Sequence, residues 1–198
     1  MQVKMDFTPA EKELRACKRC LERMISAASY EEYEESWSDF LNRLEKIFEK
    51  LDKACFPVKS KLISLISKEN MLRSSDPLLQ YLKQARNADT HTIQGIAQRV
   101  PASYGIGFNM SQGGKTAYID SLKIVNGTIT EYRGSHPLVV SFTPESVEVK
   151  EVVNRKVRYS PPASHLGNPL QTRHPTDLAK LGVEFYEQLL EKVKAAFL

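Results

Sequence analysis

The sequence predicts an α+β fold in which a helical bundle carries a small antiparallel β-sheet as an insertion. Up to about residue 98, apolar residues recur at spacings of three and four, as on one face of a helix. After Pro101 the pattern changes to glycines, turn residues and short runs that are typical of strands. From Pro175 the helical spacing returns. We therefore expect a bundle over 8–100, a β insertion over 101–160, and a connector with a C-terminal helix over 161–198 that packs back on the bundle.

Length and composition are consistent with a folded domain that has a sizeable core. The chain has 198 residues, of which 41% are hydrophobic and 26% are charged. A net charge of +4 permits RNA binding but does not indicate it. No apolar run approaches the roughly 20 residues of a membrane span, and the first residues lack the apolar core of a signal peptide. Because the cysteine number is odd at three, we expect reduced thiols and a cytoplasmic protein without a membrane segment.

The first half contains the predicted bundle helices. Thr8-Pro9 begins a helix that runs to about Ala28, and the acidic residues of 29–36 suit the start of the next helix. This second helix reaches Cys55, and one of its sides carries Trp37, Phe40, Leu41, Leu44, Ile47, Phe48 and Leu51. Residues 58–72 are expected to form one short helix and a loop.

The second half contains the predicted strands. The glycines of 105–114 indicate a loop, and 116–125 and 128–132 are strands joined by a two-residue turn at Asn126-Gly127. A third strand covers 137–142. A second hairpin joins 146–153 to 156–159 across Asn154-Arg155. We expect a meander of about five strands, then an irregular connector and a final helix over 175–197.

The most informative segment is the helix that starts at Asp76. Asp76 is a good N-cap, Pro77 suits the first helical position, and the helix extends to about Gln98, with Gly95 as an earlier stop. An apolar stripe of this helix ends next to an acidic residue. An arginine lies three positions before this acid, and a histidine lies two positions after it. The stripe is Leu78, Leu82 and Ala85, and the three polar residues are Arg86, Asp89 and His91.

Spacing alone allows a purely structural interpretation of these residues. Arg86 and Asp89 are three apart and can form an ion pair, which would leave His91 on a polar surface. Arg86 and His91 point about 140° apart on a helix, so they cannot face one another within one chain. Asn87 and His91, four apart, share a face.

The segment Arg-Asn-Ala-Asp-Thr-His over 86–91 resembles the Arg-x4-6-His motif of the HEPN superfamily. A polar residue directly after the arginine, here Asn87, is typical of that motif. The segment 78–82 and the helix from Trp37 to Cys55 also resemble HEPN bundle helices, so the similarity covers about residues 8–98. The resemblance implies a metal-independent endoribonuclease, acting as a homodimer without a cofactor, in the setting of a toxin or defence effector.

The resemblance also implies roles for the residues. Arg86 would hold the scissile phosphate and stabilise its growing charge, and His91 would move protons between the attacking and leaving oxygens. Asn87 would orient the phosphate or His91, and Asp89 or an acid of 31–35 would orient the cation. A site across a two-fold axis would suit the 140° divergence. The alternatives are a non-catalytic protein that binds a nucleotide, a peptide or a protein partner, and a structural role for the motif.

Other candidate motifs are weaker. Cys17 and Cys20 have CxxC spacing without a second ligand pair, which favours core packing over a zinc or redox site. Residues 111–116 end in Gly-Lys-Thr but lack the first glycine of a phosphate loop, since position 109 is Asn, and they precede a strand. The connector histidines are expected in a loop packed on the sheet, and the aromatic residues of the insertion in its core.

Overall fold

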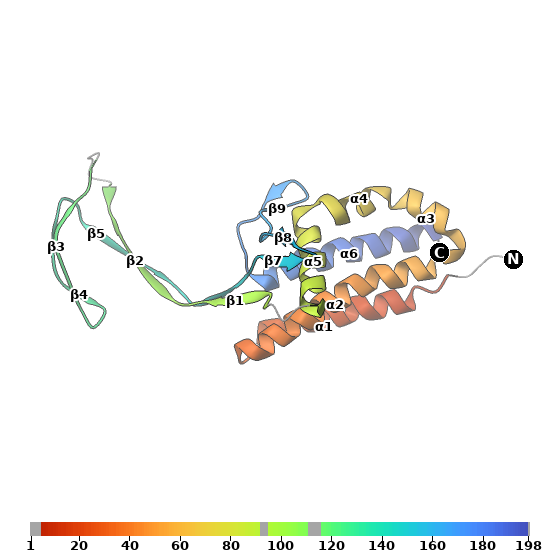
Figure 1. Cartoon of the computed structure of the whole chain (residues 1–198), viewed down its shortest axis with the longest axis horizontal. Coiled ribbons are helices and arrows are strands. Elements are labelled where there is room, and N and C mark those ends of the chain that lie inside the picture. Colours follow the sequence, from red (N-terminus) through yellow and green to blue (C-terminus); the bar gives the residue numbers. More distant parts are fainter. Residues whose placement is uncertain (1–4, 92–94, 111–115, 198) are drawn as a thin grey trace. The chain divides into compact units, whose positions relative to one another are not determined.

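The computed structural model describes residues 5–91, 95–110 and 116–197, and among these the side chains at 90 and 91 are not described (Figure 1). The chain forms two compact units. One contains the chain up to Arg99 together with Val147–Leu198, and the other is Val100–Ser146. Helices and small antiparallel sheets are both present, which confirms the α+β class.

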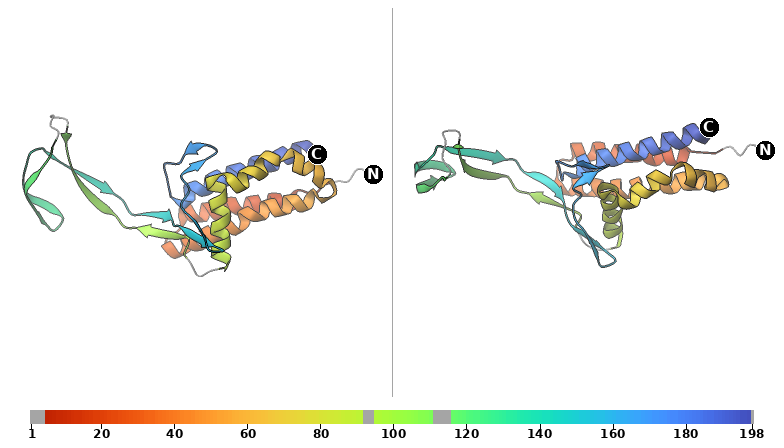
Figure 2. Two further views of the ribbon diagram at one scale, coloured as in Figure 1. Left: turned by 45° about the horizontal axis from the view of Figure 1, so that its top comes forward. Right: turned by 90° about the horizontal axis from the view of Figure 1, so that it is seen from above.

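The helices belong to the first unit. The long N-terminal pair and the C-terminal helix lie side by side, and α5 runs across them (Figures 1 and 2). The predicted short helix of 58–72 is instead two α-helices, which meet at Ile66 and follow a 3-10 turn. The helices are α1 (Thr8–Ser26), α2 (Tyr30–Ala54), η1 (Phe56–Val58), α3 (Lys59–Leu65), α4 (Ser67–Ser75), α5 (Pro77–His91) and α6 (Pro175–Phe197).

Helix α2 begins where the acidic stretch predicted a helix start. The Ser29 hydroxyl accepts a hydrogen bond from the N–H of Glu32 (3.2 Å), and the Glu32 carboxylate accepts one from the N–H of Ala28 (3.0 Å). This reciprocal arrangement is close to a capping box and satisfies backbone donors that the helix itself cannot pair.

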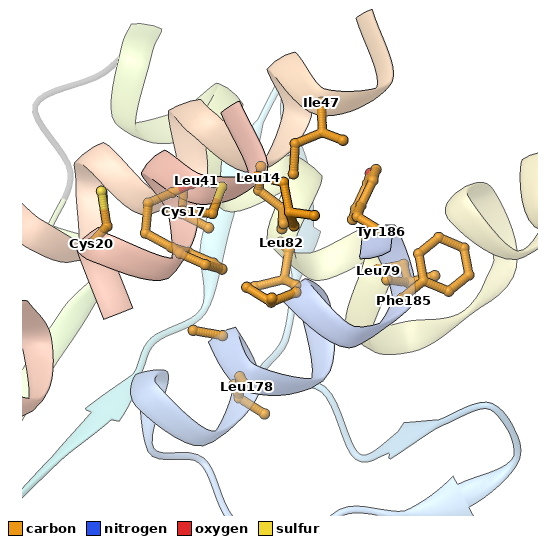
Figure 3. Close-up of a cluster of buried hydrophobic side chains, with 14 of the residues drawn as sticks. Leu14, Cys17, Cys20, Leu41, Ile47, Leu79, Leu82, Leu178, Phe185 and Tyr186 are labelled. Carbon is orange, nitrogen blue, oxygen red and sulfur yellow. Dashed lines mark hydrogen bonds between the residues drawn. The ribbon is translucent and has the colours of Figure 1, made fainter. Parts of the chain in front are cut away.

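The core lies between α1, α2, α5 and α6 (Figure 3). Trp37 is fully buried and stacks on Phe40 with ring centroids 5.6 Å apart. Gly182 of α6 allows close helix packing, because a Cβ there would lie only 2.9 Å from Cδ1 of Leu82 in α5 and 3.3 Å from Cδ2 of Leu44 in α2. The three cysteines are free and buried, as expected for core packing.

Contacts of the buried Arg73 side chain hold α4 against the bundle. The Arg73 guanidinium donates to Glu45 of α2 (2.5 Å) and to the Tyr186 hydroxyl of α6 (3.0 Å). Its face also lies 3.5 Å from the centroid of the Phe48 ring. A buried charge is tolerated when it is paired and hydrogen-bonded in this way.

Short strands complete the first unit. The antiparallel hairpins are β7 (Val152–Asn154) with β8 (Val157–Tyr159) and β9 (Ser164–His165) with β10 (Asn168–Pro169), while β1 (Ala97–Val100) pairs with β6 (Ser146–Val149). The predicted extension of the Asp76 helix to Gln98 is therefore wrong, since β1 begins at Ala97. The turn between β7 and β8 lies at Arg155-Lys156, both with positive φ, rather than at Asn154-Arg155.

The second unit is a pair of nested hairpins rather than the predicted meander. The inner hairpin joins β3 (Ile119–Val125) to β4 (Thr128–Gly134) through Asn126-Gly127, whose positive φ values confirm the predicted turn. The outer pair is β2 (Ser103–Phe108) with β5 (Leu138–Thr143). Residues 103–108, predicted as a glycine-rich loop, therefore form a strand. One face of the outer pair is apolar along its length, with the cross-strand pairs Tyr104–Phe142, Ile106–Val140 and Phe108–Leu138.

The second unit is shorter than the expected insertion of 101–160. Strands β7 and β8 belong to the helical unit because β7 packs on α5, where the Asn154 amide donates to the side-chain oxygen of Gln84 (2.7 Å). None of the described helices is long and apolar enough to cross a membrane.

Candidate functional site

Helix α5 is anchored at its start as the sequence predicted. The Asp76 carboxylate accepts a hydrogen bond from the N–H of Leu79 (3.0 Å), which is the expected N-cap interaction. The predicted stripe is buried, and Leu79, Tyr81 and Ala88 are buried with it. The Tyr81 hydroxyl donates to the carbonyl of Lys150 (2.6 Å) and ties α5 to the strand segment. The helix that carries the motif is therefore held rigidly at its start and along its buried side.

Arg86 lies in the second half of α5, at the boundary between core and solvent. Its side chain is 25% exposed and donates from Nη1 to the side-chain oxygen of Asn87 (3.2 Å). Nη2 lies 4.0 Å from a carboxylate oxygen of Glu49 in α2, and the Glu49 side chain is 48% exposed. A pair this long and this exposed contributes little stability, so an anion could replace Glu49 at low cost.

Asp89 has a different partner from the one expected. Its carboxylate accepts a hydrogen bond from the Ser38 hydroxyl of α2, while Arg86 lies against Asn87 and Glu49. The structural interpretation of an Arg86–Asp89 ion pair is therefore not supported by the contacts of these two side chains. Ser38 also lines a hollow of about 570 Å³ formed by α2 and the end of α1, with Arg23, Glu31, Glu34, Glu35 and Asp39. This acidic surface is unsuited to a phosphate.

His91 is the last residue of α5, and its side chain lies outside the described part of the structure. Positions 86 and 91 both lie in α5, and regular helix geometry separates them by about 140° around the axis. Arg86 and Asn87 are therefore the two predicted site residues that the structure brings together. Asn87 orients Arg86, which is a contact that spacing alone did not indicate.

A second polar cluster lies at the opposite end of α5. The Asp76 side chain is only 2% exposed; besides capping the helix, it interacts with Nδ1 of His165 (2.9 Å) and accepts from the N–H of Leu166 (2.6 Å). His165 was expected in a connector loop that packs on the sheet, but it is buried against the start of α5. These two residues are 89 positions apart in the chain, so no local pattern could have joined them.

The remaining candidates give no further chemical centre among the residues that the structure describes. No three His, Cys, Asp or Glu side chains in the described ranges come together as a metal site. Cys17 and Cys20 are buried, and burial raises the pKa of the Cys17 thiol, which keeps it protonated. The Gly-Lys-Thr segment falls mostly on residues 111–115, outside the described ranges.

Comparisons with known proteins found no similar protein. No protein-family profile, curated protein or solved structure matches the chain significantly.

Proposed function

We propose that the protein is a metal-independent endoribonuclease of the HEPN type, with its site on the second half of α5. The observation that carries the proposal is the partial exposure of Arg86 together with its contacts with Asn87 and Glu49. Its side chain is partly exposed, its guanidinium donates to Asn87, and its contact with Glu49 is long and exposed. A phosphate could bind such a cation in place of Glu49, because charge-assisted hydrogen bonds to a phosphate are stronger than a 4.0 Å ion pair.

In this proposal each residue has a distinct role. Arg86 binds the scissile phosphate and stabilises the charge that grows on it in the transition state. Asn87 is a positioning residue that holds the guanidinium through its side-chain oxygen. His91 transfers the proton from the attacking 2′-hydroxyl and returns one to the leaving 5′-oxygen, as the resemblance of residues 86–91 implies. Asp89 supports the helix end through Ser38 rather than the cation.

The proposal includes a homodimer. Positions 86 and 91 diverge around one helix, so the phosphate-binding and proton-transferring groups of a single chain do not converge. Two copies of α5 related by a two-fold axis would bring Arg86 of one chain close to His91 of the other. The acidic hollow beside Ser38 would lie away from the RNA, because its carboxylates repel phosphates.

The test is cleavage of labelled single-stranded RNA by the purified protein in EDTA. We expect cleavage that leaves cyclic phosphate ends, at least 100-fold slower in Arg86→Ala and in His91→Ala, which is the size of loss expected for a charge-stabilising or proton-transferring group. The matched control is Arg19→Ala, which removes an exposed arginine of α1 and should cleave at the parent rate.

Two results would count against the proposal. Cleavage that persists in both site variants would place the activity at another site or in a contaminant. If the parent protein is folded but does not cleave RNA in EDTA, the result would favour the alternative function, a non-catalytic protein that binds a nucleotide, a peptide or a protein partner.

A further inference from the structure

A second, independent site is indicated by a pocket at the start of α5. The pocket has a volume of about 590 Å³, which is within the range of small-molecule sites, and it lies wholly in the helical unit. Helices α4 and α6 form two of its walls, and the β9–β10 hairpin forms a third. Its apolar lining includes Leu72, Phe185 and Leu189, of which the last two are buried core residues.

One carboxylate in this pocket has an unsatisfied oxygen. Oε1 of Glu69 pairs with Nζ of Lys192 (2.7 Å), but Oε2 is buried and has no hydrogen-bond partner among the described residues. Burial acts to raise the pKa of Glu69, but hydrogen bonds from Lys192 and from the backbone N–H of Glu69, together with the charges of Lys192 and Lys68, outweigh it and hold the pKa below its usual value. Glu69 is therefore ionised at neutral pH. A buried carboxylate oxygen without a donor is costly, so the site favours a ligand that brings an N–H or O–H group.

The cations of the pocket favour an anionic group on the same ligand. Lys68 and Lys192 both line the pocket, and Lys68 makes no ion pair with any other described side chain. Glu69 pairs with Lys192, and the Asp76 carboxylate, which also lines the pocket, is already bound by the N–H groups of Leu79 and Leu166 and by the His165 ring. Lys68 is therefore the cation of the pocket that is left for an anionic group of a ligand. Lysine binds carboxylate, sulfonate or phosphate groups as a point charge without demanding one geometry.

The hairpin that closes the pocket is held in place by Asp76. Leu166 adopts a left-handed conformation with φ of 49°, which is unfavourable for leucine, and its N–H is bound by Asp76 (2.6 Å). The same carboxylate holds the ring of the neighbouring His165. Leu166 also lines the pocket and is 48% exposed. The unfavourable backbone conformation of Leu166 therefore occurs at a position whose apolar side chain lies at the edge of the pocket.

We propose that this pocket binds a small amphipathic organic acid that carries a hydrogen-bond donor. The apolar part of the ligand packs on Leu72, Phe185 and Leu189, and its anionic group lies beside Lys68. Its N–H or O–H group donates to Oε2 of Glu69. This site is separate from Arg86, and its ligand does not depend on the ribonuclease proposal.

The test uses two probes that share fused aromatic rings and an N–H group. Anilinonaphthalene sulfonate also carries an anion, whereas N-phenyl-1-naphthylamine is uncharged. Both are titrated into the full chain by calorimetry. The variants are Lys68→Ala, Glu69→Gln and Gln188→Trp, the last of which places a large side chain in the pocket from an exposed position on α6. Lys61→Ala, which removes an exposed lysine of α3 outside the pocket lining, is the matched control.

We expect Lys68→Ala to weaken sulfonate binding about threefold to fivefold, as for the loss of one partly exposed ion pair, and to leave the uncharged probe unchanged. Glu69→Gln should weaken the uncharged probe, because a neutral amide oxygen is a weaker acceptor than a carboxylate, and it should weaken the sulfonate probe less, because it also frees the charge of Lys192. Gln188→Trp should abolish the site for both probes, and Lys61→Ala should bind both like the parent. Urea unfolding followed by circular dichroism checks that each variant is folded. The proposal would be overturned if Lys68→Ala bound the sulfonate probe as the parent does and Gln188→Trp bound both probes as the parent does. It would also be overturned if the parent had no saturable site for either probe.

Discussion

The Asp76 carboxylate joins the start of α5 to the β9–β10 hairpin, so its removal should destabilise the helical unit strongly. Asp76→Ala removes an N-cap, which costs about 1 kcal/mol. It also removes the charged partner of the buried His165 ring and of the Leu166 N–H, at roughly 1.5–3 kcal/mol for each hydrogen bond to a charged group. Because these terms are not additive, we expect a total loss of roughly 3–5 kcal/mol in the free energy of unfolding.

The assay is urea unfolding followed by the fluorescence of Trp37, which is the only tryptophan and is fully buried in the helical unit. Asp76→Asn keeps one acceptor oxygen and should lose about half as much stability as the alanine variant. Asp39→Ala is the control, since its ion pair with Arg23 is exposed and should change stability by less than about 1 kcal/mol. If Asp76→Ala were as stable as Asp39→Ala, the proposed anchoring role of Asp76 would be refuted.

Three further predictions concern the helical unit. Arg73→Ala should cost about 3–5 kcal/mol in urea unfolding, because Glu45 is left as a buried charge without its partner; a loss below 1 kcal/mol would contradict this. Burial raises the pKa of Tyr33 to about 12, so its contribution to stability is complete below pH 10 and is lost as the pH rises toward 12. Between pH 10 and 12 the parent should therefore lose more stability than Tyr33→Phe, and parallel pH profiles would argue against this. Gly182→Ala should lower the thermal midpoint despite the better helix propensity of alanine, because the added Cβ overpacks the core; a raised midpoint would contradict the packing argument.

The sequence predicted the long helices α1, α2 and α6 and the start of α5 because their signals are local. Capping residues and apolar spacing define α2 and the start of α5, and the structure has both near the predicted positions. The final helix was predicted at 175–197, and these are the bounds of α6. The end of α5 was predicted too late, since β1 begins at Ala97 and its pairing with β6 depends on residues almost 50 positions away.

The strand region shows why the remainder of the fold was harder to predict. Tyr104, Ile106 and Phe108 alternate with small residues, which is a strand period, but the two glycines between them indicated a loop. Which strands pair is decided by contacts distant in sequence, so a nested arrangement and a meander have the same local pattern.

The candidate site was only partly predictable for the same reason. Residues 86–91 gave a motif, but the contacts of Arg86 with Glu49 and of Asp89 with Ser38 depend on how α5 crosses α2. The pocket beside Glu69 combines α4, α6 and the β9–β10 hairpin, and none of these segments carries a recognisable binding motif of its own.

The most direct test of the proposed ribonuclease site is complementation between two inactive variants. Arg86→Ala and His91→Ala chains are co-expressed, purified together and assayed for RNA cleavage in EDTA. If the site forms across a two-fold axis, half of the dimers are mixed and each has one intact site out of two, so about a quarter of the parent activity should return. If the mixture is as inactive as either variant alone while the parent protein cleaves, the shared site is contradicted.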